Sequence, residues 1–244
     1  MRTPRIHTHQ TLSPDSTLSL EEGPARHLIQ VLRLKADAPV ILFNGDGHDY
    51  QGVIISLGKR QVDIAISERG AQESAACLAI HLGLGISKGE RMDFAIQKSV
   101  ELGVTEITPL VSERCVVRIS DERMQKRIQH WQNILIAACE QSGRRRLPML
   151  HAPLKLQDWI NKREAQQHNL LLDHRSSDTL ASLSPAESGT CLLVGPEGGL
   201  SEEEIASAKR EGFQGVQLGP GVLRTETAPL AAIAAMQALW GDFR

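Results

Sequence analysis

The stretch that decides the fold is residues 191–228, which read CLLVGPEGGLSEEEIASAKREGFQGVQLGPGVLRTETA. It holds two short and mainly apolar runs, residues 192–194 and 216–218, and each run ends in a loop of glycine and proline. A continuous apolar run of this length is typical of a strand that is buried on both faces. The two runs therefore predict parallel strands, each followed by a helix, in an α/β fold.

The first of these helices carries a clear start signal. Ser201 can accept a hydrogen bond from the amide three residues on, and the Glu204 side chain can reach back to the Ser201 amide, which is a capping box. A second, long apolar helix is predicted from about Glu226 to Trp240.

The two loops predict a ligand site. Open α/β sheets bind small molecules at the carboxyl ends of their strands, and we expect both loops to face one pocket there, on neighbouring parallel strands. Neither loop is a G-x-G-x-x-G or a G-x-x-x-x-G-K-[ST] motif, so neither a dinucleotide-binding fold nor a P-loop NTPase is predicted. Glycine also ends strands that have no site beside them, because it permits positive φ, so a purely structural role of the loops stays open.

Polar residues between the second loop and its helix strengthen the prediction of a site. Thr225 or Thr227 can be an N-cap, and Glu226 suits the positive end of the helix dipole. These roles leave Arg224 without an explanation.

At this point the residues match a family. GPEGGLSEEE (195–204), LGPGVLRTETA (218–228) and the ending WGD (240–242) closely resemble the RsmE-type 16S ribosomal RNA uridine-N3 methyltransferases of the SPOUT, or trefoil-knot, superfamily. Upstream stretches resemble other parts of the family in the expected order: HLIQVLR (27–33), LFNGDG (42–47), QKSVELGV (97–104), PL (109–110), SERC (112–115) and ACEQSGR (138–144). Together the matches cover most of the chain.

The resemblance implies a fold and its domains. It implies an α/β SPOUT trefoil-knot domain with a parallel sheet over residues 73–244, preceded by a small PUA-like β-barrel domain that binds RNA over residues 1–72. The knotted cofactor site would lie at about residues 192–230. A homodimer is also implied, with the site near the interface, and the helix over residues 229–240 is a candidate for that contact or for burial within one subunit.

The resemblance further implies S-adenosyl-L-methionine as the cofactor and a uridine of 16S rRNA, in the 30S subunit, as the substrate. Backbone groups of Leu218 and Leu223 would bind the adenine edge, and residues 195–199 would contact the rest. The residues assigned to the cofactor are Leu172, Val194, Gly195, Pro196, Glu197, Gly198, Gly199, Leu218, Gly219, Pro220, Leu223, Thr225, Thr227 and Ala228.

Methylation of uridine N3 requires a nearby proton acceptor or a cation that stabilises the negative charge that develops on the uracil oxygens. Arg224 is the candidate for the charge, and Glu226 is the candidate for the proton. Either residue can instead order the cofactor loop. Two departures from the family are visible, Gly221 in place of a usual basic residue and Ala-Pro at residues 38–39 in place of a glycine/acid turn.

Composition narrows the class of protein. The formal net charge of −2 excludes RNA binding by a uniformly basic surface, so RNA contacts are expected from local patches. The four cysteines form no C-x-x-C pair, so neither a zinc site nor a disulfide framework is predicted, and no metal is expected. No apolar run is long enough to span a membrane, and we expect a cytoplasmic protein without membrane partners.

Arginines are the candidates for phosphate contacts, since guanidinium groups bind phosphate with two hydrogen bonds. With aromatic residues at only 3%, stacking of bases on rings is not expected to dominate. His7, His9 and His27 could stack on bases or be ordinary surface residues, and the arginine run at 144–146 could instead complement a helix C-terminus. The residues assigned to RNA are Arg33, Arg114, Arg144, Arg145 and Arg146.

Periodicity predicts the remaining elements. An N-G dipeptide between apolar runs predicts a hairpin over residues 39–55, with one helix near 24–32 and a linker at 70–74. Further on, strands are predicted over residues 78–86, 105–111 and 169–173. Helices are predicted over residues 91–102 and 121–142 and around Trp159.

Two functions of other classes stay open. The chain could be a non-catalytic RNA-binding or ribosome-assembly protein on a methyltransferase scaffold, or a nucleotide-binding enzyme that uses the loops for phosphate. Binding of S-adenosylmethionine or of ATP would separate these alternatives.

Overall fold

The computed structural model describes residues 3–115, 121–162, 168–184 and 188–243. The chain divides into two compact units. The first comprises Met1–Ala75 and Ile136–Leu147, and the second comprises Ala76–Leu135 and Pro148–Arg244. The first unit therefore includes a short segment from the middle of the chain, besides the amino-terminal residues.

The first unit is built on a five-stranded sheet. Its strands, in spatial order, are β1 (Arg5–His7), β3 (Pro39–Phe43), β4 (Tyr50–Leu57), β5 (Val62–Arg69) and β2 (Ser16–Ser19). The predicted hairpin is confirmed, because β3 and β4 pair antiparallel on either side of the Asn-Gly turn, where Gly45 and Gly47 both have φ near +90°. The sheet wraps around one apolar core to which all five strands contribute.

The helix predicted near residues 24–32 is present but changes type. It begins as α1 (Glu22–Arg26) and continues as a π-helical turn, η1 (His27–Val31), in which Leu32 N–H bonds to the His27 carbonyl at 3.0 Å. Leu28 is fully buried and attaches this segment to the core.

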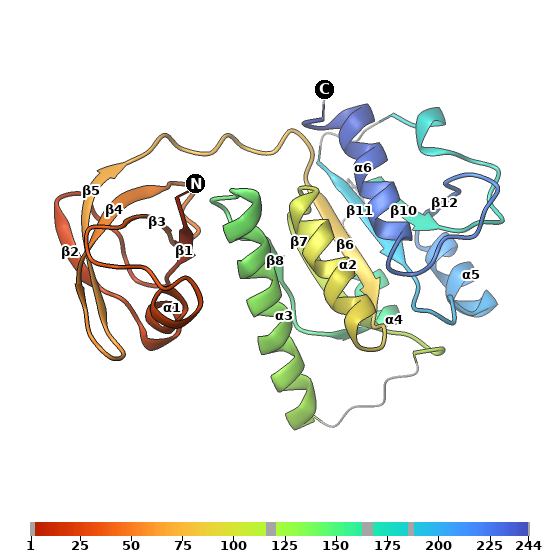
Figure 1. Ribbon diagram of the computed structural model, residues 1–244. Helices are drawn as coiled ribbons and strands as arrows, with labels where there is room; N and C mark the ends of the chain where they lie inside the picture. The colour runs from red at the N-terminus through yellow and green to blue at the C-terminus, as the bar shows by residue number, and fades with distance from the viewer. Residues whose placement is uncertain (1–2, 116–120, 163–167, 185–187, 244) are drawn as a thin grey trace. The chain divides into compact units, whose positions relative to one another are not determined.

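The second unit contains a wholly parallel sheet of seven strands among the described residues (Figure 1). The spatial order is β12 (Gln214–Val216), β10 (His168–Leu172), β11 (Thr190–Val194), β6 (Ile80–Gly85), β7 (Glu106–Val111) and β8 (Met149–Leu150), with β9 (Leu154–Lys155) also paired to β7. The parallel α/β fold predicted from sequence is confirmed. Strands β6 and β11 are buried along their whole length, as their apolar runs predict.

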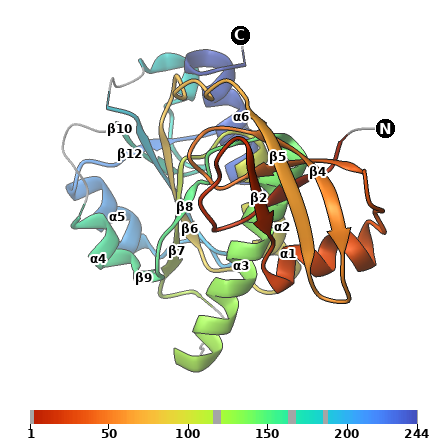
Figure 2. The same cartoon turned by 90° about the vertical axis from the view of Figure 1, so that its left-hand side faces the viewer.

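Helices cover both faces of this sheet (Figure 2). The helices α4 (Leu156–Ile160) and α5 (Glu202–Arg210) lie on one face, and α2 (Glu90–Glu101) and α6 (Ala228–Trp240) lie on the other. Trp159 of α4 packs directly over Gly83, where a Cβ would stand 2.4 Å from the indole ring. Among the described residues, no helix is both long and apolar enough to cross a lipid bilayer.

Two further elements complete the description. The helix α3 (Asp121–Ser142) has the predicted bounds, and Gly143 follows it with φ of +91°. The 3₁₀ turn η2 (Leu180–Ser182) precedes β11.

One detail of the predicted sheet is wrong. The strands that precede the two glycine loops are not neighbours, because β10 lies between β11 and β12. All three strands run in the same direction, so their carboxyl ends still meet at one edge.

Candidate functional site

A pocket of about 760 Å³ opens at the carboxyl ends of β10, β11 and β12. It lies entirely within the second unit. The predicted site residues that line it are Leu172, Val194, Gly195, Pro196, Glu197, Gly198, Gly199, Leu218, Gly219, Leu223, Arg224, Thr225, Glu226, Ala228 and Arg114. Pro220 and Thr227 are not part of its wall.

The first loop is pressed against the end of β6. A Cβ at Gly85 would stand 2.4 Å from the Pro196 nitrogen, so only glycine allows the backbones to approach this closely. The loop then turns through a hydrogen bond from Gly199 N–H to the Pro196 carbonyl at 2.8 Å, with φ of +67° at Gly199. These close contacts fix the shape of the pocket wall.

The predicted capping box after this loop is confirmed. Glu204 N–H donates to Ser201 Oγ at 3.3 Å, and Ser201 N–H donates to Glu204 Oε2 at 2.9 Å. The other Glu204 oxygen accepts a hydrogen bond from Glu113 N–H at 2.8 Å. The helix start therefore also holds the loop that follows β7.

The second loop is tied to the first by a threonine. Thr225 Oγ1 donates to the Gly195 carbonyl at 2.8 Å and lies 3.4 Å from Ser87 Oγ, so it is not a cap of α6. Thr227 occupies the N-cap position but makes no capping hydrogen bond with its side chain. The Arg224 carbonyl instead accepts from the amides of Thr227 and Ala228, both at 2.9 Å.

Two glutamates and an arginine meet at the wall of the pocket. Arg91, the second residue of α2, places Nη1 3.4 Å from Glu197 Oε1 and Nε 3.9 Å from Glu226 Oε1. The Oε2 atoms of both glutamates are buried without a hydrogen-bond partner. The wall of the pocket therefore contains two carboxylates that share one guanidinium. The exposed Arg224 lies in the same wall.

The environment of Glu197 favours its ionised form. Burial alone would raise the pKa of this carboxyl, but hydrogen bonds from Lys88 N–H at 2.9 Å, from its own amide and from Arg91 lower the pKa on balance. Glu197 thus contributes a fixed negative charge beside Glu226.

The end of β10 contributes a charged cluster that the sequence analysis did not assign. Asp173 is buried and accepts from Arg175 Nε at 3.3 Å and from Lys209 Nζ at 3.1 Å, and Arg175 also pairs with Glu202. Burial raises the pKa of Asp173, but the Arg175 amide and these cations lower it on balance. The sequence does contain a signal for this cluster, since residues that follow a predicted parallel strand lie at the edge of the sheet where ligands bind.

Arg114, assigned to RNA, lies at the mouth of the pocket. Its Nη1 donates to the Gly198 carbonyl at 3.3 Å, and a Cβ at Gly198 would stand 3.1 Å from Arg114 Cβ. A side chain at position 198 would therefore press on the Arg114 backbone and side chain, which would have to shift by a few tenths of an ångström.

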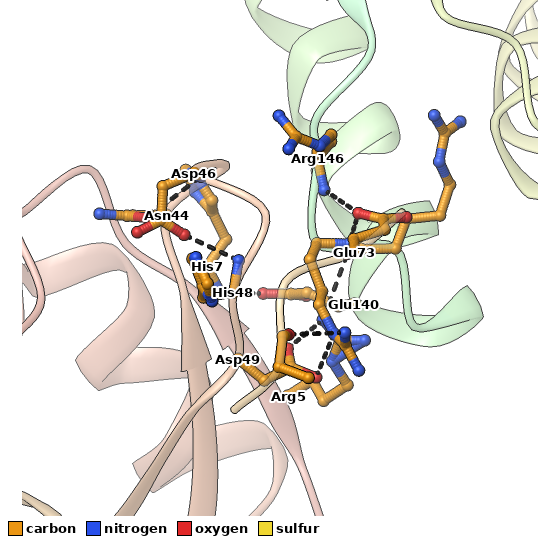
Figure 3. A network of polar contacts seen from close by, with 12 residues as sticks. Arg5, His7, Asn44, Asp46, His48, Asp49, Glu73, Glu140 and Arg146 are labelled. Carbon is orange, nitrogen blue, oxygen red and sulfur yellow. Dashed lines mark hydrogen bonds and ion pairs between the residues drawn. The ribbon is translucent and has the colours of Figure 1, made fainter. Parts of the chain in front are cut away.

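The arginines at 144–146 lie in the first unit, where acids of the same unit bind part of the run (Figure 3). Arg145 Nε bonds to Asp49 Oδ2 at 3.0 Å, and Asp49 also pairs with the buried Arg5 at 2.7 Å. Glu73 Oε2 accepts from the amides of Arg145 and Arg146 at 2.9 and 2.7 Å. Glu73, which lies in the predicted linker, thus holds the turn at residues 145–146.

The three arginines differ in what they can offer to a ligand. Arg144 is partly buried, and burial lowers the pKa of its guanidinium. Arg146 is exposed, as is Arg33, which follows the π-helical turn by two residues and has φ of +51°. Arg146 and Arg33 therefore keep exposed side chains for a phosphate contact, whereas Arg145 is committed to Asp49.

His7 is not a surface residue. It is only 4% exposed, its amide donates to Glu140 at 3.0 Å, and burial together with His9 lowers the pKa of its imidazole to about 4, although Glu21 raises it. This histidine is thus neutral and packed in the protein at neutral pH.

Comparison with known proteins shows the family to which the chain belongs. Residues 73–237 match the model of an RNA methyltransferase domain, and residues 21–67 match that of an RNA methyltransferase PUA domain. The ribosomal RNA small subunit methyltransferase E of Buchnera aphidicola (subspecies Schizaphis graminum) is 35% identical over 99% of this chain and 98% of its own. The Bacillus subtilis enzyme of that name is 27% identical over 94% and 93%. The chain belongs to the family of the ribosomal RNA small subunit methyltransferases E.

Solved structures of family members superpose along the whole chain. The ribosomal RNA small subunit methyltransferase E of Neisseria gonorrhoeae, bound to S-adenosyl methionine, has a TM-score of 0.92 at 40% identity and covers 100% of both chains. A putative methyltransferase of Legionella pneumophila, also with S-adenosyl methionine, has a TM-score of 0.95 at 39% identity and covers 99% of this chain and 100% of its own. The α/β fold and the amino-terminal PUA domain therefore match the fold class expected from sequence.

Proposed function

We propose that this chain transfers a methyl group from S-adenosylmethionine to N3 of one uridine in 16S rRNA, with the 30S subunit as substrate. The observation that carries the proposal is the pocket whose two loops are joined by Thr225, in a chain whose family members bind S-adenosyl methionine. The PUA match at residues 21–67 supports RNA as the macromolecular partner.

The pocket suits this cofactor. Its volume of about 760 Å³ falls in the ordinary range for small-molecule sites, and its wall combines apolar side chains with backbone groups of the two loops. Backbone groups of Leu218 and Leu223 are the candidates for the adenine edge, and residues 195–199 are those for the remainder. The cationic sulfonium of the cofactor is complemented by the free carboxylate oxygens of Glu197 and Glu226.

The cofactor supplies an electrophilic methyl group, which N3 attacks as the carbon–sulfur bond breaks and S-adenosylhomocysteine leaves. The chain must align the two partners and accept the N3 proton. Glu226 has a buried, unpartnered Oε2 in the pocket wall for that proton. Arg224, exposed in the same wall, would stabilise the charge that develops on the uracil oxygens.

Arg91 gives Glu226 a fixed position. Its Nε lies 3.9 Å from the other oxygen of that carboxylate, while its Nη1 contacts Glu197. One guanidinium between two carboxylates limits the repulsion between them and leaves the Oε2 atom of each without a hydrogen-bond partner among the described residues. Alignment of this kind can contribute several kcal/mol, within the ~7–11 kcal/mol available from orientation.

RNA contacts would be made by exposed cations. Arg114 lies at the pocket, and Arg146 and Arg33 lie on the first unit. The expected homodimer, with α6 at its contact, stays a prediction. One face of α6 is already buried within the chain, where Gln237 donates to the Leu102 carbonyl at 3.2 Å.

Two experiments test the proposal. Calorimetry with S-adenosylmethionine, S-adenosylhomocysteine and ATP should show binding of the first two alone. Mass mapping of rRNA from cells that lack the gene should show loss of one methyluridine, restored by the wild-type gene. Cofactor binding without any missing methyl group would support the non-catalytic scaffold instead, and binding of ATP alone would support the nucleotide-binding enzyme.

A further inference from the structure

A cluster of two histidines and a glutamate lies at the amino-terminal edge of the parallel sheet, the edge opposite to the pocket. His81 is the second residue of β6, Glu106 is the first of β7, and His151 directly follows β8. The ladders pair His81 with Glu106 and Glu106 with Met149. Because side chains alternate along a strand, residues 81, 106 and 151 all point to the face that α4 covers.

The three side chains converge on one point. His151 Nε2 lies 2.7 Å from Glu106 Oε2, and His81 Nδ1 lies 3.5 Å from the same oxygen. All three potential ligand atoms lie within 4.8 Å of one another. Tetrahedral zinc with bonds of ~2.0–2.1 Å holds its ligand atoms roughly 3.3 Å apart, so shifts of about 1–1.5 Å would close the site.

His81 is already oriented for such a role. It is buried, its ring meets the Trp159 ring edge-on at 5.7 Å, and Nε2 lies 2.7 Å from Thr108 Oγ1. When Nε2 carries the proton and donates it to Thr108, Nδ1 is the unprotonated ring nitrogen, and it faces Glu106 at 3.5 Å. A hydrogen bond from the second ring nitrogen to an acceptor fixes the tautomer of a histidine that binds a metal, and Thr108 Oγ1 stands in the position of that acceptor.

The other two ligands can move and can be reached from solvent. The side chains of His151 and Glu106 are 33% and 41% exposed. The rings of His151 and His81 are stacked, with centroids 5.1 Å apart, so binding requires the His151 ring to turn, which its exposure allows. That exposure also leaves a fourth position open to water.

We propose that His81, Glu106 and His151 bind one divalent transition-metal ion, with Zn²⁺ as the ion that best fits the donors. Two imidazole nitrogens and one carboxylate oxygen are a ligand set of zinc, whereas Mg²⁺ and Ca²⁺ prefer oxygen alone. Cysteine spacing in the sequence predicts no metal site. The three residues of this cluster are far apart in the sequence and come together only through the pairing of the strands.

The test uses the untagged full-length protein, freed of metal with a chelator and titrated with ZnCl₂ in a calorimeter. One ion per chain should bind, and Co²⁺ should give the visible absorption of a four-coordinate site. Glu106→Gln and His151→Gln should weaken binding at least tenfold, and Thr108→Val by roughly 10–100-fold. Because Glu106 and His151 are partly exposed, their variants are expected to fold, which a melting curve without metal would confirm.

His130→Gln is the matched control, since His130 also bonds to a carboxylate, Asp93, at 2.8 Å but belongs to no group of three possible metal ligands among the described residues. Its zinc binding should equal that of the wild type. The proposal is overturned if the wild type binds no zinc at one ion per chain, or if the cluster variants bind it as well as the control does. Methyl transfer does not enter the measurement, so this result is independent of the proposed function.

Discussion

Thr225 Oγ1 donates a hydrogen bond to the carbonyl oxygen of Gly195 at 2.8 Å, across thirty positions of the sequence. This bond joins the loop after β11 to the loop before α6, so the two walls of the pocket form one structure. A ligand that contacts either loop therefore depends on both.

Removal of the Thr225 hydroxyl should separate the two loops. We expect Thr225→Val to weaken S-adenosylmethionine binding and to lower the free energy of unfolding by about 0.5–1.5 kcal/mol, because the half-buried Gly195 carbonyl loses this hydrogen bond. Thr225→Ser keeps the hydroxyl and should stay close to wild type in both measurements. Calorimetry and urea denaturation would check this, and equal affinities for the valine and serine variants would contradict it.

Gly198 should tolerate no side chain, whereas a second glycine of the same pocket should. A Cβ at Gly198 would press on Arg114, but nothing lies within 4 Å of one at Gly221. We expect Gly198→Val to abolish cofactor binding with the fold largely retained, and Gly221→Val to keep both. If Gly198→Val binds S-adenosylmethionine like the wild type, the first loop is merely a turn.

The adjacent residues Arg145 and Arg146 should have different roles, the first in stability and the second in RNA binding. Arg145→Ala removes a partner of Asp49 and should lower the free energy of unfolding by about 1–3 kcal/mol. Arg146→Ala should change stability by less than about 0.5 kcal/mol, because its side chain is exposed, and should reduce the slope of log affinity for RNA against log salt by at most about one. An unchanged slope would remove Arg146 from the RNA surface.

The pattern of apolar residues predicted most of the second unit, because strands such as β6 and β11 are buried along their whole length and consist mainly of apolar residues. The Ser201–Glu204 cap was predictable for a similar reason, since all its atoms lie within four residues. The position of β10 between β11 and β12 was not, because strand order is set by packing over long distances in sequence.

The residues of the candidate site also divide into those that the local sequence predicts and those that only the folded structure brings together. The loop residues were found from their sequence, but Arg91 was not, because it approaches Glu197 and Glu226 only once α2 packs beside both loops. Arg144 and Arg145 were assigned to RNA on charge alone. A sequence cannot reveal that Asp49 lies beside Arg145 in the folded unit.

Arg224 and Glu226 should differ in their response to pH. Loss of an electrostatic stabiliser typically slows a reaction by ~10²–10³, and loss of a general base by ~10²–10⁴, so the size of the effect cannot separate the two roles. With Glu226→Gln the residual single-turnover rate should rise steeply with pH, because hydroxide replaces the base. With Arg224→Ala it should stay low at every pH. A wild-type rate and pH profile for Glu226→Gln would exclude that residue from the mechanism.

The central claim is tested most directly by reaction of the purified chain with 30S subunits from cells that lack the gene, in the presence of labelled S-adenosylmethionine. After digestion of the 16S rRNA, mass analysis of the labelled nucleoside identifies the methylated atom. The account predicts about one methyl group per subunit, at N3 of a single uridine, and no label with Glu226→Gln at neutral pH within the same reaction time. A methyl group on a ribose, on another base or on no RNA at all would contradict it.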